Sequence, residues 1–359
     1  MKSKARDIYL DFYRGIATIS VVFIHTVYWS GENYLTDNMG ILYTLVLLVD
    51  VPLFVFLSGW SAFYTDNIKR TFDNLLKIWM QYIVFIIITD IVCHVILHPG
   101  TFSVQDLLYQ MVFAGNTPYV PAVAGSLWFM PMWIPVTLVG SILTVLLRRS
   151  AEKSDQYIYI YIRIITFLLV GVAWFSVTNQ STYFGLSRNF CFYISFFLLG
   201  YLLADCRFKG RLWQYLALCA AIIILWFLVS RAFQIPAKGL QNAKFPPHLM
   251  YFVASLLSVV TAVYFRGKID AIVQYCSAIR FVGKNALPFY FSQGIGSSII
   301  YYVYPHFLPY GPSVTLAICF AVNLVITLVC GTGLILIYKG VFWVVDSTKR
   351  CMVKNRYSK

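Results

Sequence analysis

Long apolar runs separated by short polar segments fill the chain from residue 8 to residue 338. A transmembrane helix needs about 20 apolar residues, and ten runs approach or exceed that length. The pattern therefore predicts an all-α integral membrane protein of about ten transmembrane helices. The expected spans are 8–28, 41–63, 75–97, 127–147, 158–177, 190–204, 212–229, 249–265, 286–304 and 314–338.

The polar segments between the spans are too short for a separate soluble domain. We expect residues 1–359 to form a single transmembrane domain, with residues 1–7 and 346–359 as basic cytoplasmic ends. Two connections exceed a tight turn: residues 98–126, where 106–113 are expected to form an interfacial helix, and residues 230–247. The two halves show no inverted repeat, which disfavours a secondary transporter.

Composition supports the membrane assignment. The chain is 60% hydrophobic and only 12% charged, so too few charges are available to cover a water-soluble domain of 359 residues. We do not expect the first apolar run to be a cleaved signal peptide, because it contains Asp11, Arg14 and His25 and lacks a small-residue cleavage site. The eight cysteines are scattered without a C-x-x-C pair, so we interpret them as reduced packing residues and expect no metal site.

The cations alternate with the predicted spans. With the N-terminus in the cytoplasm, 22 of the 28 lysines and arginines fall in inner segments, and only four, Arg188, Arg231, Lys238 and Lys244, fall in outer ones. This asymmetry follows the positive-inside rule and predicts an even number of spans with both termini cytoplasmic. The net charge of +14 therefore indicates topology and not nucleic-acid binding. The four outer cations are either ordinary loop charge or contacts to an anionic lipid-diphosphate carrier or acidic glycan.

Two ionisable residues of the first span share one helical face. Arg14 and His25 are eleven residues apart, so they differ by only about 20° around the helix and lie about 16 Å apart along its axis. Taken alone, Arg14 is explained as a snorkelling anchor and His25 as a packed core histidine. Taken together, they fit a cation that holds an anionic donor and a histidine that performs acid–base chemistry.

Other intramembrane polar residues allow two interpretations each. Asp50 and Asp90 either orient His25 or line a hydrated or neutralised site. Asn323 is interpreted as an interhelical hydrogen bond. His94 and His98 have a metal-compatible spacing, but the absence of a Glu or Cys companion favours an interfacial histidine pair.

Five motifs in a fixed order indicate a family. They are YLDFYRGIA at residues 9–17 with VVFIH at 21–25, VPLFVFLSGW at 51–60, LWFM at 127–130, FPPHLMY at 245–251 and VGKNALPFY at 282–290. This ordered set resembles the membrane-bound acyltransferase family 3, whose first helix carries an Arg and a His separated by ten residues. Many relatives also place a histidine shortly after the last tyrosine, where this chain has Gln293. Gln293 can form hydrogen bonds but cannot exchange a proton, so the acid–base role rests on His25.

The resemblance implies an enzyme of the bacterial cytoplasmic membrane that transfers an acyl group, usually acetyl from cytoplasmic acetyl-CoA, to a hydroxyl of an extracytoplasmic or lipid-linked glycan. It implies that Arg14, with Asp11, holds the donor and that His25 is the catalytic base or acyl carrier. The expected supporting or acceptor-binding residues are Asp50, Asp90, Trp128, His248, Tyr251 and Gln293.

Two rival functions stay open on the sequence alone. A secondary transporter or flippase for a lipid-linked glycan or small anion would use Arg14, Asp50 and His25 as a substrate and proton path, and would depend on a proton gradient instead of acetyl-CoA. A non-catalytic membrane partner in glycan assembly would tolerate substitution of both Arg14 and His25.

Overall fold

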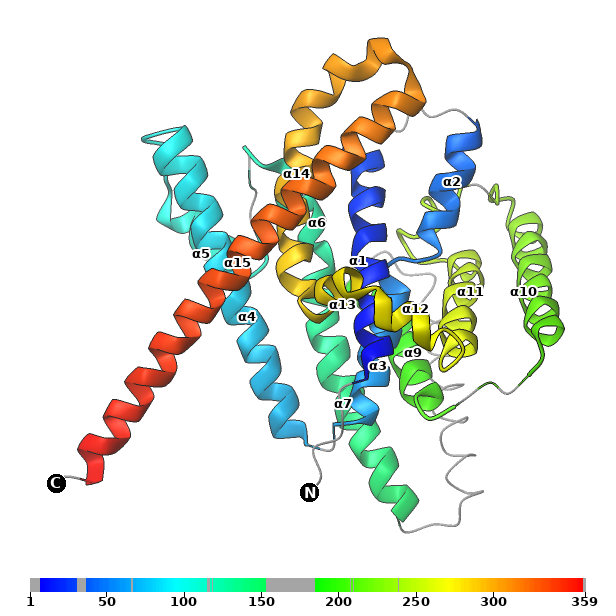
Figure 1. Ribbon diagram of the computed structural model, residues 1–359, viewed down its shortest axis with the longest axis horizontal. Coiled ribbons are helices and arrows are strands. Elements are labelled where there is room, and N and C mark those ends of the chain that lie inside the picture. Colours follow the sequence, from blue (N-terminus) through cyan, green and yellow to red (C-terminus); the bar gives the residue numbers. More distant parts are fainter. Residues whose placement is uncertain are drawn as a thin grey trace. The chain divides into compact units, whose positions relative to one another are not determined.

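A computed structural model describes residues 7–30, 37–65, 67–114, 117, 119–152, 185–206, 208, 210–237 and 239–357. All regular structure in these residues is helical, and they contain no strand, in agreement with the predicted all-α class. The elements (Figure 1) are α1 Ile8–Trp29, α2 Asp37–Leu47, α3 Val51–Phe63, α4 Ile68–Asp90, a π-helical turn Ile91–Leu97, α5 Val104–Met111, α6 Pro121–Ser126, a 3₁₀ turn Leu127–Phe129, α7 Met130–Glu152, α9 Gly185–Leu203, α10 Leu212–Ala232, α11 Leu249–Phe265, α12 Asp270–Tyr275, α13 Ser277–Lys284, α14 Ala286–Val303, a 3₁₀ segment Tyr304–Tyr310 and α15 Pro312–Tyr357.

The chain forms two compact units. The first comprises Met1–Leu75 and Trp128–Lys284, and the second comprises Leu76–Leu127 and Asn285–Lys359. The first unit therefore contains α1 to α3, α7 and α9 to α13. The second contains most of α4, together with α5, α6, α14 and α15.

Within the described residues, six helical segments are long and apolar enough to cross a membrane: Ile8–Trp29, Gly40–Phe63, Ile68–Leu97, Pro121–Arg149, Leu212–Ala232 and Pro312–Val344. Two shorter apolar helices, Asn189–Leu203 and Leu249–Phe265, add to them. These helices support a multi-pass membrane protein. The count of ten spans and the inward orientation of both termini stay predictions, and the predicted span 158–177 lies outside the described residues.

The second predicted span is broken, which corrects the expectation of one continuous helix over 41–63. α2 ends at Leu47, and α3 begins at Val51 after Asp50, whose backbone is extended (φ −123°, ψ −158°). Pro52 explains the break, because in a continuous helix it would lack the N–H that bonds to the carbonyl of Leu48 and its ring would clash with that carbonyl, whereas a proline is accommodated in the first turn of a helix. The break places the carboxylate of Asp50 between two apolar helices.

Glycines bring the backbones of α3 and α9 into direct contact in the first unit. A Cβ added at Gly59 would lie 1.8 Å from the carbonyl oxygen of Phe197, and one at Gly200 would lie 1.9 Å from that of Phe56. Such close crossings through small residues are typical of membrane helices, where packing replaces the hydrophobic driving force. The crossing fixes the helix that carries Asp50 at its start.

In the second unit, α14 and α15 form a helical hairpin around the segment Tyr304–Tyr310 (Figure 1). A Cβ at Gly296 would lie 2.1 Å from the side-chain oxygen of Asn323, so the two helices also cross closely. α15 has 46 residues and continues to Tyr357, well past the predicted end at residue 338. At 1.5 Å per residue it is about 69 Å long, roughly twice the thickness of a hydrocarbon core.

Candidate active site

α1 carries Arg14 and His25 as the sequence predicts. The helix is uninterrupted from Ile8 to Trp29 and is capped by Asp7, whose carboxylate accepts from the amide of Tyr9 at 3.0 Å. The spacing of three turns, about 16 Å, therefore holds along one rigid element. Arg14 and His25 are both half-buried, whereas the residues that immediately flank each of them are buried. Their side chains are thus among the few polar groups of α1 that stay partly exposed.

Arg14 points towards α3. Its Nη2 donates to the carbonyl oxygen of Leu57 at 3.4 Å, and its own carbonyl accepts from the hydroxyl of Thr18 at 2.8 Å. This contact directs the guanidinium towards a neighbouring helix of the first unit, which differs from the outward direction of a snorkelling anchor.

α13 crosses α1 beside Arg14. A Cβ added at Gly15 would lie 2.1 Å from the carbonyl oxygen of Ile279, and one at Gly283 would lie 1.6 Å from that of Asp11. Asp11 is buried at this crossing. The contact explains in physical terms why glycines stand in the two motifs at residues 9–17 and 282–290.

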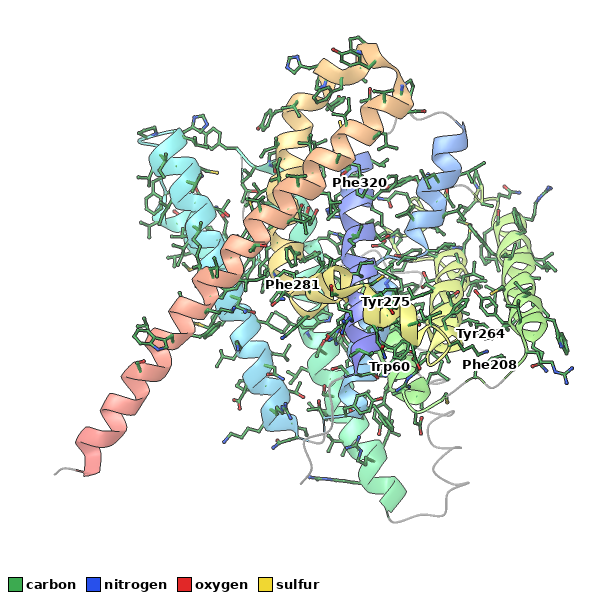
Figure 2. The ribbon with its side chains drawn as sticks, viewed as in Figure 1. Trp60, Phe208, Tyr264, Tyr275, Phe281 and Phe320 are labelled. Carbon is green, nitrogen blue, oxygen red and sulfur yellow. The ribbon has the colours of Figure 1, made fainter. Side chains whose placement is uncertain are left out.

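Arg266 joins several helix ends of the first unit. Its Nη2 lies 3.2 Å from Asp7 and donates to the Tyr64 hydroxyl at 2.6 Å, and its Nη1 donates to the carbonyl of Ala204. Its guanidinium also lies 4.4 Å from the ring centre of Trp60, which is labelled in Figure 2. One side chain thus ties α11 to the ends of α1, α3 and α9.

These contacts set the relative depth of the polar groups on α1 and α3. The Tyr64 hydroxyl donates to Asp7 at 3.3 Å, and seven residues further along α1 Arg14 donates to Leu57, which lies seven residues before Tyr64. α1 and α3 are therefore antiparallel, and one residue along α1 matches one residue back along α3. Seven further residues along each helix bring Asp50 level with Val21. Asp50 therefore lies about one helical turn, roughly 6 Å, from the level of His25 on the side of Arg14.

Asp50 forms a buried ion pair. Lys244 Nζ lies 2.6 Å from Asp50 Oδ2, and the hydroxyl of Tyr251 donates to the same oxygen at 3.0 Å. The side chains of Lys244 and Asp50 are only 3% and 2% exposed. The interpretation of Lys244 as ordinary outer-loop charge is therefore wrong. The contacts of Asp50 are to Lys244 and Tyr251, and its predicted role in orienting His25 stays untested.

Two aromatic rings lie beside this ion pair. Trp128 and Phe245 meet edge to face with their centres 4.6 Å apart, and each ring centre lies 5.4 Å from Lys244 Nζ. Tyr251 stacks on Phe192 at 5.5 Å. The structure thus brings together Asp50, Trp128 and Tyr251, which the sequence selected separately.

His248 has a local structural contact. Its Nδ1 accepts from the amide of Met250 at 3.2 Å at the N-terminus of α11, and its ring lies against Phe233. Helix capping accounts for this geometry. The predicted contact of His248 with an acceptor stays a prediction.

Asp90 and its neighbours lie in the second unit. Asp90 Oδ1 accepts from the amide of Gln110 at 3.2 Å and lies 3.6 Å from Nε2 of His94, at the start of the π-helical turn. His94 and His98 both lie against the ring of Tyr119. Across the described residues no group of three or more potential ligands is placed to hold a metal ion.

Gln293 belongs to a buried hydrogen-bond chain between α14 and α15. Asn323 donates to the hydroxyl of Ser297 at 3.1 Å, and that hydroxyl donates to the side-chain oxygen of Gln293 at 3.3 Å. The predicted interhelical bond of Asn323 is confirmed. Gln293 contributes to helix packing here, and its catalytic relevance stays untested.

A family model for the Acyltransferase domain matches residues 7–335. The match begins at the cap of α1, ends within α15 and covers nearly the whole chain. The chain belongs to this acyltransferase family. The resemblance predicted from the five motifs is thereby confirmed, and the protein is a membrane acyltransferase. No curated protein and no solved structure shows a significant match to it.

Sequence reasoning missed two residues of this acyltransferase. Lys244 was assigned to an outer loop, although it supplies the counter-ion of Asp50, and Arg266 was counted only as an inner charge. The sequence did contain a signal for Lys244, because the predicted intramembrane carboxylate of Asp50 lacked a partner and Lys244 was a cation in a predicted outer segment. Nothing in the local sequence marked Arg266.

Proposed function

We propose that this acyltransferase moves an acetyl group from cytoplasmic acetyl-CoA to a hydroxyl of an extracytoplasmic or lipid-linked glycan. The observation that carries the proposal is the pairing of Arg14 and His25 on one face of the continuous helix α1. Their separation of about 16 Å is comparable to the extended pantetheine arm of coenzyme A. A donor whose phosphates bind at Arg14 therefore reaches His25 with its thioester.

His25 supplies the acid–base chemistry in this proposal. Its imidazole takes the proton of the acceptor hydroxyl, the oxygen attacks the thioester carbonyl carbon, and the carbon–sulfur bond breaks as the thiolate of coenzyme A leaves and is protonated. In a second route His25 itself takes the acyl group and then passes it to the hydroxyl. The two routes differ in whether labelled acetyl stays on the protein when no acceptor is present.

The test uses the full chain in lipid nanodiscs with radiolabelled acetyl-CoA and a crude glycan fraction as acceptor. We expect His25→Ala to abolish transfer, because a positioned base contributes about 10²–10⁴-fold. His306→Ala is the matched control, since His306 is exposed in the segment Tyr304–Tyr310. Transfer by His25→Ala at the rate of His306→Ala would disprove the mechanism.

Arg14 is tested separately. Arg14→Lys keeps the charge but loses the planar fork that matches a phosphate group, so we expect the KM for acetyl-CoA to rise about tenfold, and further in Arg14→Gln. Lys268→Gln is the control, because Lys268 is an exposed cation that follows α11. An unchanged donor KM in both Arg14 variants would assign Arg14 a purely structural role.

A further inference from the structure

We propose that Asp50, Lys244 and Tyr251, with the rings of Trp128 and Phe245, form the subsite that binds an uncharged sugar ring of the acceptor. The inference rests on the proposed acyl transfer to a glycan and names the chemical class of that glycan. Four features of the cluster support it: unused hydrogen-bonding capacity, charge balance, aromatic surface and depth.

The ion pair leaves hydrogen-bonding capacity unused. Lys244 and Tyr251 both bond to Oδ2 of Asp50, and no residue in the described part of the chain bonds to Oδ1. The Lys244 ammonium has three N–H donors, and within the same residues Asp50 is its single hydrogen-bond acceptor. Unused donors on a side chain that is 3% exposed are costly, so the cluster favours a partner that supplies hydroxyl oxygens and protons.

The charge of the pair selects a neutral partner. Lys244 at 2.6 Å from Asp50 cancels the carboxylate, so the cluster has no net charge to attract a diphosphate or a uronic acid. This replaces the idea that Lys244 contacts an anionic carrier. A carboxylate oxygen beside ammonium protons instead matches adjacent hydroxyl groups, which both donate and accept.

Aromatic rings provide the apolar wall of the subsite. Phe245 is 46% exposed and Trp128 is half-buried, so both rings offer surface to a ligand above Lys244. A few placed polar groups beside aromatic walls are typical of small-molecule sites. The C–H face of a pyranose packs against such rings, while its hydroxyls reach the ion pair.

The depth of the cluster suits an acceptor for His25. The count along α1 and α3 places Asp50 about one turn from the level of His25. The residues between α2 and α3 are irregular, and non-helical backbone at membrane depth is tolerated where it is buried or lines a hydrated cavity. Many membrane transporters likewise bind their substrates where a transmembrane helix is interrupted.

The acceptor is tested with soluble probes. Methyl glucoside, galactoside and mannoside are compared with the corresponding methyl uronides as acceptors for the wild-type chain in nanodiscs. We expect acetylation of at least one neutral pyranoside and at least tenfold slower acetylation of its uronide. Equal or faster acetylation of the uronides would overturn the inference.

Two variants test the residues with the pyranoside that is acetylated fastest. Phe245→Ala is expected to raise the acceptor KM about tenfold and to leave the acetyl-CoA KM unchanged, because its ring lies beside Lys244 and is 46% exposed. Asp50→Asn with Lys244→Gln keeps an uncharged buried pair, so it tests recognition without leaving one charge unpaired, and we expect a similar rise. Arg231→Met, an exposed cation at the end of α10, is the control. An acceptor KM equal to that of the control in both variants would overturn the subsite.

The outcomes separate the two proposals. Release of coenzyme A that depends on His25, without transfer to any pyranoside, would overturn the sugar subsite and leave the acyltransferase proposal intact. If no release of coenzyme A depends on His25, both the acyltransferase mechanism and the sugar subsite are wrong.

Discussion

Substitution of Gly283 by alanine tests whether the α1–α13 crossing positions Arg14, the proposed donor-binding residue. The added Cβ would lie 1.6 Å from the carbonyl oxygen of Asp11 and 2.5 Å from the amide nitrogen of Gly15. Ordinary contact begins near 3.4 Å, so α13 must move away from α1 by about 1.8 Å, the difference between the two distances. Overpacking of this kind typically costs about 1–3 kcal/mol of stability.

The effect on catalysis is expected to exceed the effect on stability. Arg14 is adjacent to Gly15, and a misplacement of about 1 Å lowers rates roughly 10²-fold. We therefore expect Gly283→Ala to reduce kcat/KM for acetyl transfer about 10²-fold with a lowered but measurable melting temperature.

The assay compares Gly283→Ala with Gly333→Ala in nanodiscs. Gly333 lies in α15, where an added Cβ meets no heavy atom within 4 Å, so this variant controls for the glycine-to-alanine change itself. A folded Gly283→Ala protein with the kcat/KM of the control would refute the reasoning, because the crossing would then not position Arg14.

Three further predictions concern stability, measured as melting temperature in detergent. Arg266→Gln should destabilise the chain by about 3–5 kcal/mol because it leaves the carboxylate of Asp7 without its ion-pair partner, and a shift below that of Lys268→Gln would contradict this. Lys244→Met should destabilise more than Lys244→Met combined with Asp50→Asn, since the double variant leaves no buried charge; additive effects would show that the pair is not coupled. Asn323→Leu should cost about 1–3 kcal/mol, because the hydroxyl of Ser297 loses its donor and a larger side chain meets α14; no change in melting temperature would disprove the bond.

The sequence predicts helices best where local chemistry marks their ends. α11 spans Leu249–Phe265 as predicted, because Pro246 and Pro247 precede its cap at His248 and Gly267 follows it. α10 and α14 also begin at the predicted residues. The break before α3 was missed because an average over an apolar run hides one carboxylate. Pro52 was the available signal, because a proline cannot continue a helix from the preceding turn.

Contacts distant in sequence could not be predicted. Asp50 and Lys244 are 194 residues apart, and each had several possible partners of opposite charge among the other intramembrane or outer residues. Asp90, by contrast, lies near His94 at a spacing of four residues, which local geometry allows. One sequence shows which intramembrane polar residues require a partner, but only the fold shows which residue that partner is.

The buried pair also changes how the charge asymmetry should be counted. The positive-inside rule concerns cations that face the membrane interface, whereas Lys244 is 3% exposed and neutralised by Asp50. Removing it from the predicted outer set leaves three cations, Arg188, Arg231 and Lys238, against 22 in the predicted inner segments. The exception that suggested an anionic ligand is thus a structural counter-ion. In the proposed acceptor subsite, Lys244 would therefore act through its hydrogen bonds and not through net charge.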